Sequence, residues 1–206
     1  MSCLGSNILR LWTIQTVDVW MTLRRDGLWR STNALVSQDW PDAYRWMARQ
    51  MEARLVPRQV SDQMPVWAWY QWDGIRRPRP DLRARGHLPT NTAGVRLELE
   101  VSSERVLLSD FDLWHYALNY WYLPSSVGEG RAFDAELKRQ ALCYYRIKPL
   151  PDRRAHNAIE RSWERMFDLG WTNRALTAKK GEKRIQGVLW ELRLDDVRQV
   201  RKFIAR

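Results

Sequence analysis

Cysteine is scarce in this sequence of 206 residues, and the short motifs of several common enzyme classes are missing. The two cysteines, Cys3 and Cys143, are too few for a disulfide framework and lack the paired spacing of a zinc site. There is no glycine-rich phosphate loop, no Gly-x-Ser-x-Gly elbow and no His-Glu-x-x-His motif. These absences remove the usual support for a nucleotide hydrolase, a serine hydrolase or a zinc protease, and the cysteine content suits a reducing compartment.

Long apolar stretches are missing as well. No apolar run reaches the ~18 residues that a membrane-spanning helix needs. The first residues lack a basic stretch followed by a long apolar core, so they do not resemble a secretory signal. We therefore expect a cytoplasmic protein that does not enter a membrane.

Tryptophan, in contrast, is abundant. The chain holds 13 tryptophans, and 45% of its residues are hydrophobic, which is typical of a globular protein with a substantial core. Segments with strand and helix periodicity are interspersed along the whole length. We predict one α+β domain over residues 1–206, with a mostly antiparallel sheet and helices packed around it.

Positive charge is also abundant, and it is unevenly distributed. The formal net charge is +10, and residues 131–206 hold 19 Lys+Arg against 10 Asp+Glu, whereas residues 1–130 hold 15 against 14. A local excess of this sign attracts nucleic acid or another polyanion. The alternative interpretation is a set of solvated helix faces with no binding role.

Residues 94–123 form the best-organised stretch. Apolar and charged residues alternate at 95–101, which predicts a half-buried strand, and the apolar run 106–108 is expected to return beside it as a hairpin. Ser109 stands three residues before Asp112, the spacing of a capping box, so a helix is expected to begin there.

The polar side chains Asp112, His115 and Asn119 follow one another along this helix at spacings of three and four. A histidine oriented by a carboxylate can transfer protons near neutral pH, so Asp112 and His115 are candidate catalytic residues and Asn119 a candidate ligand contact. A hydrogen-bonded network with a structural role is the alternative. A metal site with Asp110 is a weaker one, and we predict no metal.

The other periodic segments predict further strands and helices. Before the arginine-rich residues 75–89, we expect a strand at 9–15, a helix capped by Thr16 and ended by Gly27, a helix begun by Asp39 and ended before Pro57, and a strand at 66–72. After residue 123, we expect helices at 133–147 and 153–169, a strand at 185–194 and a short terminal helix. In the strand at 66–72, Trp67 and Trp69 share one face. They are expected either to stack on a nucleobase or nicotinamide ring or to pack in the core.

Residues 75–89, called the arginine loop below, combine arginine with proline and glycine. Guanidinium groups clamp phosphate oxygens with two parallel hydrogen bonds, so Arg76, Arg77, Arg79 and Arg83 are candidate contacts to nucleic acid. A basic turn adds four more candidates, Lys179, Lys180, Lys183 and Arg184. A solvated loop is the alternative for the arginine loop.

Several segments together resemble an uncharacterised bacterial domain family of unknown function. They are Leu11-Trp12-Thr13-Ile14-Gln15, Pro65-Val66-Trp67-Ala68-Trp69, Arg79-Pro80-Asp81-Leu82-Arg83, Leu108-Ser109-Asp110-Phe111-Asp112 with Trp114-His115, Ser162-Trp163-Glu164, and 186–191. Residues 128–156 match no motif of that family, and we predict a helical insertion there.

The order of the elements is similar to that of small ADP-ribosyltransferase-like domains. The similarity implies a cleft that binds NAD without a metal, with Thr13 or Gln15 on the first strand, Trp67 or Trp69 on the second and Gln186 on a late strand. The first strand lacks the His or Arg usual in such domains, and Gln186 stands where they carry an acid.

Two functions of different classes follow from these observations. The first is an ADP-ribosyltransferase-like enzyme or a toxin or phage-defence effector that binds NAD, with Gln186 as its catalytic residue. The second is a nucleic-acid-binding module without catalysis. A protein that binds a partner, such as an antitoxin or a defence-system component, is a third interpretation.

Overall fold

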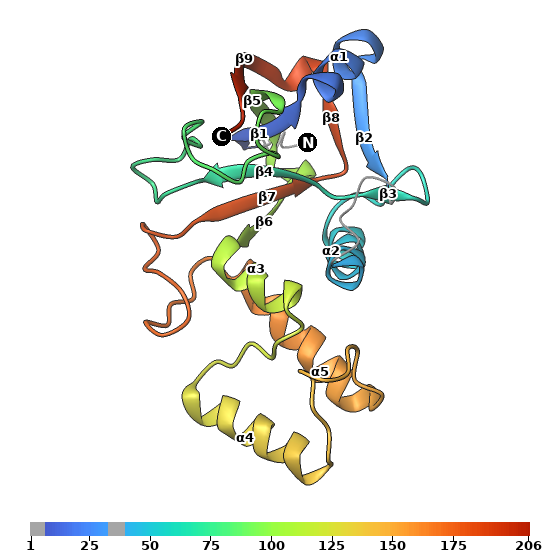
Figure 1. Ribbon diagram of the computed structural model, residues 1–206, viewed down its shortest axis with the longest axis vertical. Coiled ribbons are helices and arrows are strands. Elements are labelled where there is room, and N and C mark those ends of the chain that lie inside the picture. Colours follow the sequence, from blue (N-terminus) through green and yellow to red (C-terminus); the bar gives the residue numbers. More distant parts are fainter. Residues whose placement is uncertain (1–6, 33–39) are drawn as a thin grey trace, which may run out of the picture. The chain divides into compact units, whose positions relative to one another are not determined.

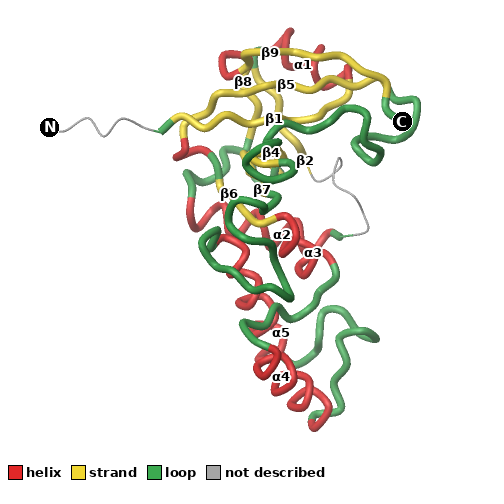
Figure 2. Tube along the Cα trace, turned by 90° about the vertical axis from the view of Figure 1, so that its left-hand side faces the viewer, coloured by secondary structure: helices red, strands yellow, loops and turns green. Residues whose placement is uncertain are grey.

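The computed structural model describes residues 7–32 and 40–206. The chain forms two compact units, one from residues 1–108 and 184–206 and the other from residues 109–183. We call them the sheet unit and the helical unit. The strands belong to the sheet unit, whereas the helical unit consists of helices and loops apart from the end of one strand (Figures 1 and 2).

The sheet unit contains a six-stranded sheet and a three-stranded one. In the order β6-β7-β4-β1-β5-β9, the six strands are Leu107–Asp110, Ile185–Leu189, Val66–Gln71, Ile8–Thr16, Ala93–Ser102 and Val197–Ile204. In the order β3-β2-β8, the smaller sheet comprises Gln63–Met64, Leu28–Thr32 and Glu191–Arg193. The pairings with a defined register are antiparallel, which confirms the predicted α+β class and its mostly antiparallel sheet.

Two helices belong to the sheet unit, α1 (Val17–Asp26) and α2 (Pro41–Arg54). The predicted limits of α1 are confirmed, because the Thr16 hydroxyl accepts a hydrogen bond from the Val19 amide and Gly27 ends the helix with a φ of 73°. The predicted cap Asp39 of the next helix lies outside the described residues.

The core of the sheet unit follows from alternation along β1 and β5. Leu11, Leu97 and Leu99 are buried on the same face, and the intervening residues point to the opposite face. Gly187 of β7 also belongs to the core face, where a Cβ atom would approach Val106 to 2.7 Å. The inner side of the sheet is therefore closely packed.

Two predicted elements are wrong. The run 106–108 does not pair with the strand before it, because β1 and β9 occupy both edges of β5 and a 3₁₀ turn, Ser103–Arg105, leads the chain to β7 instead. The predicted terminal helix is the strand β9, whose backbone pairs with β5. Its apolar residues recur every third position, a helical spacing that backbone pairing overrides.

The helical unit contains α3 (Phe111–Leu118), α4 (Val127–Arg139) and α5 (Arg153–Trp163). Asp110, not the predicted Ser109, caps α3 by accepting hydrogen bonds from the amides of Asp112 and Leu113. Helix α4 begins and ends earlier than predicted. It begins at Val127 because the Ser126 hydroxyl accepts a hydrogen bond from the Glu129 amide, while the Glu129 carboxylate accepts one from the amide of Ser125. The predicted insertion at 128–156 falls inside this unit and stays a prediction.

Candidate nucleic-acid interface

The six-stranded sheet has a face opposite its core, called the open face. Directly opposed residues of antiparallel strands point to the same face. The register places Gln199, Glu98, Trp12, Trp69 and Gln186 in one row across β9, β5, β1, β4 and β7. This row crosses five strands, so charged, aromatic and amide side chains form a continuous surface.

The arginine loop lies against the open face, where it lines two cavities of about 520 and 700 Å³. Seven arginines line these cavities, and we call them the arginine face: Arg10, Arg76, Arg77, Arg79, Arg83, Arg96 and Arg201. Three carboxylates line them as well: Asp73, Asp81 and Glu98. Positive charge is therefore in excess on this surface.

Some of these arginines are neutralised. The ion pairs are Arg83 Nη2 with Asp81 Oδ2 at 2.7 Å, Arg10 Nη2 with Glu100 Oε1 at 3.2 Å, and Arg77 Nη1 with Asp73 Oδ2 at 3.5 Å. All three are exposed, so each contributes little to stability. Their main effect is to orient the guanidinium groups.

The other arginines have no such partner. Arg79, Arg96 and Arg201 form no ion pair within residues 7–32 and 40–206, and Arg96 Nη1 donates its hydrogen bond to the carbonyl of Pro80 at 2.7 Å. Arg96 and Arg201 are directly opposed across β5 and β9. Burial lowers the pKa of Arg96, and the neighbouring charges of Arg79 and Arg201 lower it further, whereas Glu98 and Asp81 oppose the shift without reversing it. This group of like charges would be stabilised by a bound anion.

Backbone hydrogen bonds shape the arginine loop. The amide of Trp72 donates to the carbonyl of Pro78 at 2.9 Å, and the amide of Arg77 donates to the carbonyl of Gly74 at 3.1 Å. Further along, His87 Nε2 lies 2.8 Å from the carbonyl of Asp81. The loop is thus tied to itself at several points, which lowers the entropy cost of positioning its arginines.

Aromatic rings lie beside the arginines. The rings of Trp69 and Trp72 meet edge to face with centroids 4.6 Å apart, and Trp72 lies 5.0 Å from the ring of His87. Trp69 and Trp72 are partly exposed, whereas Trp12 is only 7% exposed and donates from Nε1 to Glu98. Trp69 and Trp72 therefore have ring area available for stacking.

The structure brings together only part of the residue set predicted for NAD. Trp69 and Gln186 are opposed on the open face, and Trp67 shares that face, with its ring edge-on to Tyr44 of α2 at 5.9 Å. Thr13 is fully buried on the core face, where its hydroxyl donates to the carbonyl of Trp67 at 2.8 Å. Gln15 bonds to the Thr13 hydroxyl at 2.7 Å, so both side chains point away from Trp69.

The polar side chains of α3 belong to the helical unit. His115 Nδ1 lies 3.0 Å from the carbonyl of Phe111, and Asn119 Nδ2 donates to the carbonyl of His115 at 2.8 Å. These side-chain bonds of His115 and Asn119 therefore go to the backbone of their own helix. Asp112 is partly buried in the first turn of the helix.

The predicted basic turn divides into exposed and buried residues. Lys179, Lys180 and Arg184 are exposed. Lys183 is fully buried, and its ammonium group donates to Asp110 Oδ2 at 2.7 Å. The prediction that Lys183 contacts nucleic acid is thus corrected, because an ammonium group that water cannot reach cannot meet a phosphate.

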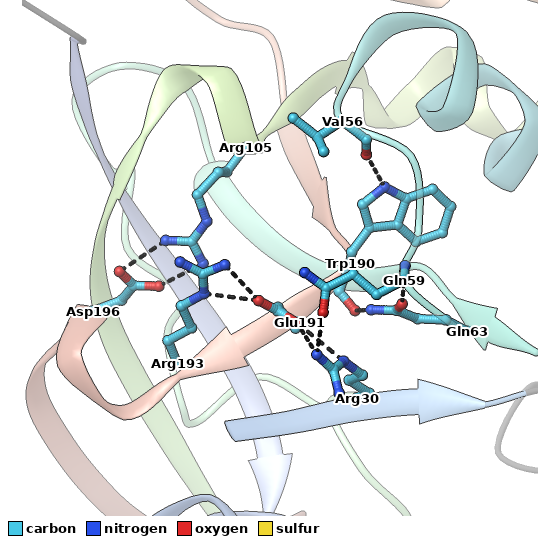
Figure 3. A network of polar contacts seen from close by, with 9 residues as sticks. All are labelled: Arg30, Val56, Gln59, Gln63, Arg105, Trp190, Glu191, Arg193 and Asp196. Atoms are coloured by element: carbon cyan, nitrogen blue, oxygen red, sulfur yellow. Dashed lines mark hydrogen bonds and ion pairs between the residues drawn. The ribbon is translucent and has the colours of Figure 1, made fainter. Parts of the chain in front are cut away.

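Sequence reasoning missed Arg96 and Arg201. Arg96 had a signal, because it is one of the charged residues at alternate positions of β5, whereas Arg201 lies in a segment with helical spacing. Their proximity depends on the pairing of β5 with β9, which the sequence did not predict. It also missed the polar network that Glu191 forms with Arg30 and Arg193, which Figure 3 shows.

Residues 7–32 and 40–206 lack two further features. No helix there is both long and apolar enough to cross a membrane. No group of three or more His, Cys, Asp or Glu side chains in the same residues is arranged to hold a metal ion.

Comparison with known proteins gives one match. The model of a family described as a domain of unknown function, DUF3841, matches residues 10–198 and so extends through both units. No curated protein matches the chain. No solved structure matches it either.

Proposed function

We propose that this chain, which belongs to the DUF3841 family of domains of unknown function, binds single-stranded nucleic acid through its arginine face. The observation that carries the proposal is the group formed by Arg79, Arg96 and Arg201. None of these three arginines forms an ion pair with a carboxylate of the described residues. Keeping like charges close together costs free energy. Phosphate groups of a nucleic-acid backbone would offset that cost and release counterions on binding.

A single strand suits this surface better than a duplex. Trp69 and Trp72 lie next to the arginines on the same side of the sheet, and unpaired bases can stack on exposed aromatic rings. A duplex keeps its bases inside and offers only its backbone and grooves. The combination of a basic groove and aromatic rings is typical of proteins that bind single strands without strict sequence preference.

The direct test measures the affinity of the full chain for a fluorescent oligonucleotide of about 20 nucleotides in about 50 mM salt. We expect Arg79→Ala and Arg201→Ala each to weaken binding about tenfold, the effect of about 1.4 kcal/mol. Arg25→Ala and Arg45→Ala are matched controls, because both arginines are exposed and ion-paired on α1 and α2. We expect these controls to bind as the unmodified chain does.

The proposal would be wrong if the unmodified chain failed to bind single strands at low salt. It would also be wrong if the four variants lost affinity equally, since net charge alone would then explain binding. A preference for duplex over single strands of the same length would contradict the stacking role of Trp69 and Trp72.

ADP-ribosyl transfer from NAD stays a prediction. The adjacency of Trp69 and Gln186 on the open face supports it, whereas Thr13 and Gln15 point to the core. A transfer assay with labelled NAD would test it, and loss of labelling in Gln186→Ala would assign the catalytic residue. A partner from a toxin or defence system likewise stays a prediction, to be tested by co-purification.

A further inference from the structure

A cavity of about 240 Å³ in the sheet unit lies among residues that the proposed function does not use. Three segments line it: residues 55–63 after α2, the turn after β5 with Glu104 and Arg105, and residues 189–193 where β7 continues into β8. Figure 3 shows a network of polar contacts at this cavity, which includes the lining residues Trp190, Glu191 and Arg193. One side of the cavity is apolar and the other is charged.

The apolar side is built around Trp190. Its Nε1 donates to the carbonyl of Val56 at 2.9 Å, and its own carbonyl accepts a hydrogen bond from Gln63 Nε2 at 2.7 Å (Figure 3). Gln63 is only 1% exposed, so this anchor is inside the protein. Leu55 and Leu189 also line the cavity. The indole is therefore held in one position, and the guanidinium group of Arg58, which also lines the cavity, lies over its ring at 5.9 Å from the centroid.

The charged side is organised by Glu191, a buried residue. Arg30 donates from Nε and Nη2 to Glu191 Oε2, at 3.0 and 2.9 Å. The Nε and Nη2 atoms of Arg193 each lie 2.7 Å from Glu191 Oε1 (Figure 3). Burial alone would raise the pKa of Glu191, but the two arginines outweigh it and lower that pKa. Glu191 is thus an anion whose two oxygens are already occupied.

The remaining hydrogen-bonding capacity of the cavity belongs mainly to donors. A guanidinium group has five N–H bonds, and Arg193 directs only part of them to Glu191. Arg105 donates a hydrogen bond from Nη1 to Asp196 Oδ1 at 3.0 Å. Its Nη2 lies 2.9 Å from Asp196 Oδ2 in the same ion pair, but this nitrogen is buried and has no hydrogen-bond partner among the described residues. The side-chain oxygen of Gln63 already accepts from the Gln59 amide. The buried part of the cavity therefore favours a ligand that supplies acceptors.

Glu104 limits the charge of that ligand. Its side chain is exposed at the lining of the cavity, and its carboxylate forms no ion pair with a described residue. A second negative charge on a ligand would be repelled by it. A carboxylate, with one charge and two acceptor oxygens, fits these donors better than a doubly charged phosphate ester.

We propose that this cavity binds a small aromatic monocarboxylate, with its ring against Trp190 and its carboxylate on the free N–H groups of Arg193 and Arg105. The planar ring packs against the indole beside Arg58 and against the apolar side chains, and the guanidinium groups of Arg193 and Arg105 bind the acid. The site is separate from the arginine face, because the two share no lining residue.

The test is isothermal titration of the full chain with indole-3-acetate, benzoate, their neutral amides, and adenosine monophosphate as a phosphate probe. We expect an acid to bind at least about tenfold more tightly than its amide, because only the acid forms charge-assisted hydrogen bonds. We expect the phosphate probe to bind more weakly than the acids.

Variants assign the site. We expect Arg193→Lys, which keeps the charge but loses the planar fork, and Trp190→Leu each to weaken acid binding at least about fivefold. Glu104→Gln should strengthen it about threefold by removing a repelling charge. Trp20→Leu is the matched control for Trp190. An arginine lies over each of these two indoles, Arg24 over Trp20 and Arg58 over Trp190, but Trp20 lines no part of this cavity.

Three results would overturn the proposal: equal affinity for acids and amides, unchanged binding in both Arg193→Lys and Trp190→Leu, or weaker binding in Glu104→Gln. Thermal melting of each variant separates loss of binding from loss of folding. Arg79→Ala should leave acid binding unchanged, so this site and the proposed nucleic-acid site can fail independently.

Discussion

Some arginines of the sheet unit form ion pairs with carboxylates, and others do not. Arg83 lies 2.7 Å from Asp81 and Arg10 lies 3.2 Å from Glu100, whereas Arg79 and Arg201 have no ion pair with any residue that the structure describes. The sequence predicted the arginine loop as a candidate contact but could not tell these two groups apart. Which arginines are neutralised depends on the conformation of the loop and on strand register, and neither follows from composition.

Glu191 offers a test at the residue scale. Glu191→Gln leaves Arg30 and Arg193 without their shared anion, so we expect the free energy of unfolding at neutral pH to fall by about 1 to 3 kcal/mol. Because the arginines lower the pKa of Glu191 in the folded state, this contribution is present above the unfolded pKa of about 4.3 and is lost as the pH falls through the lower folded value.

Urea denaturation at neutral pH and at about pH 3 measures this effect. The difference between Glu191→Gln and the unmodified chain should shrink at the lower pH. Asp26→Asn serves as control, because Asp26 pairs with Arg25 on the exposed surface, and we expect a change within about 0.5 kcal/mol. A difference for Glu191→Gln that grew as the pH fell would contradict this assignment.

At the scale of elements, the sequence predicted the features that depend on residues close together in the chain, such as helix caps and the buried face of a strand. The limits of α1 followed from Thr16 and Gly27, and alternation along β5 identified its buried face. Caps and alternation do not predict which strands, far apart in the sequence, pair with each other. The partners of β5 are β1 and β9. The apolar run 106–108, predicted to form a hairpin with β5, therefore contributes to β6 and lies beside β7, and the segment with helical spacing is the strand β9.

Gly187 tests how closely β7 packs. An added methyl group would lie 2.7 Å from Val106 Cγ1 and 3.2 Å from Leu108 Cδ2, so Gly187→Ala should lower the free energy of unfolding by about 1 to 3 kcal/mol. Gly181→Ala is the matched control, because nothing lies within 4 Å of the added carbon. Thermal or urea unfolding compares the two, and equal stability of both variants would show that the packing is looser than described.

At the scale of the whole molecule, the excess charge lies mostly in one unit. Residues 1–108 and 184–206 hold 21 Lys+Arg against 14 Asp+Glu, whereas residues 109–183 hold 13 against 10. The sequence suggested a basic C-terminal third, but its last 23 residues belong to the sheet unit. They bring Arg201 to the open face opposite Arg96. The predicted α+β class and the resemblance to a family of unknown function are confirmed, and the function stays a proposal.

The most direct test of the account is the salt dependence of binding to a single-stranded oligonucleotide, measured from about 50 to 200 mM salt for the unmodified chain and for Arg79→Ala/Arg201→Ala. If these arginines each contact a phosphate, the slope of log affinity against log salt concentration should become shallower by about 1.4 in the double variant. An unchanged slope, or no binding by the unmodified chain at the lowest salt concentration, would contradict the account.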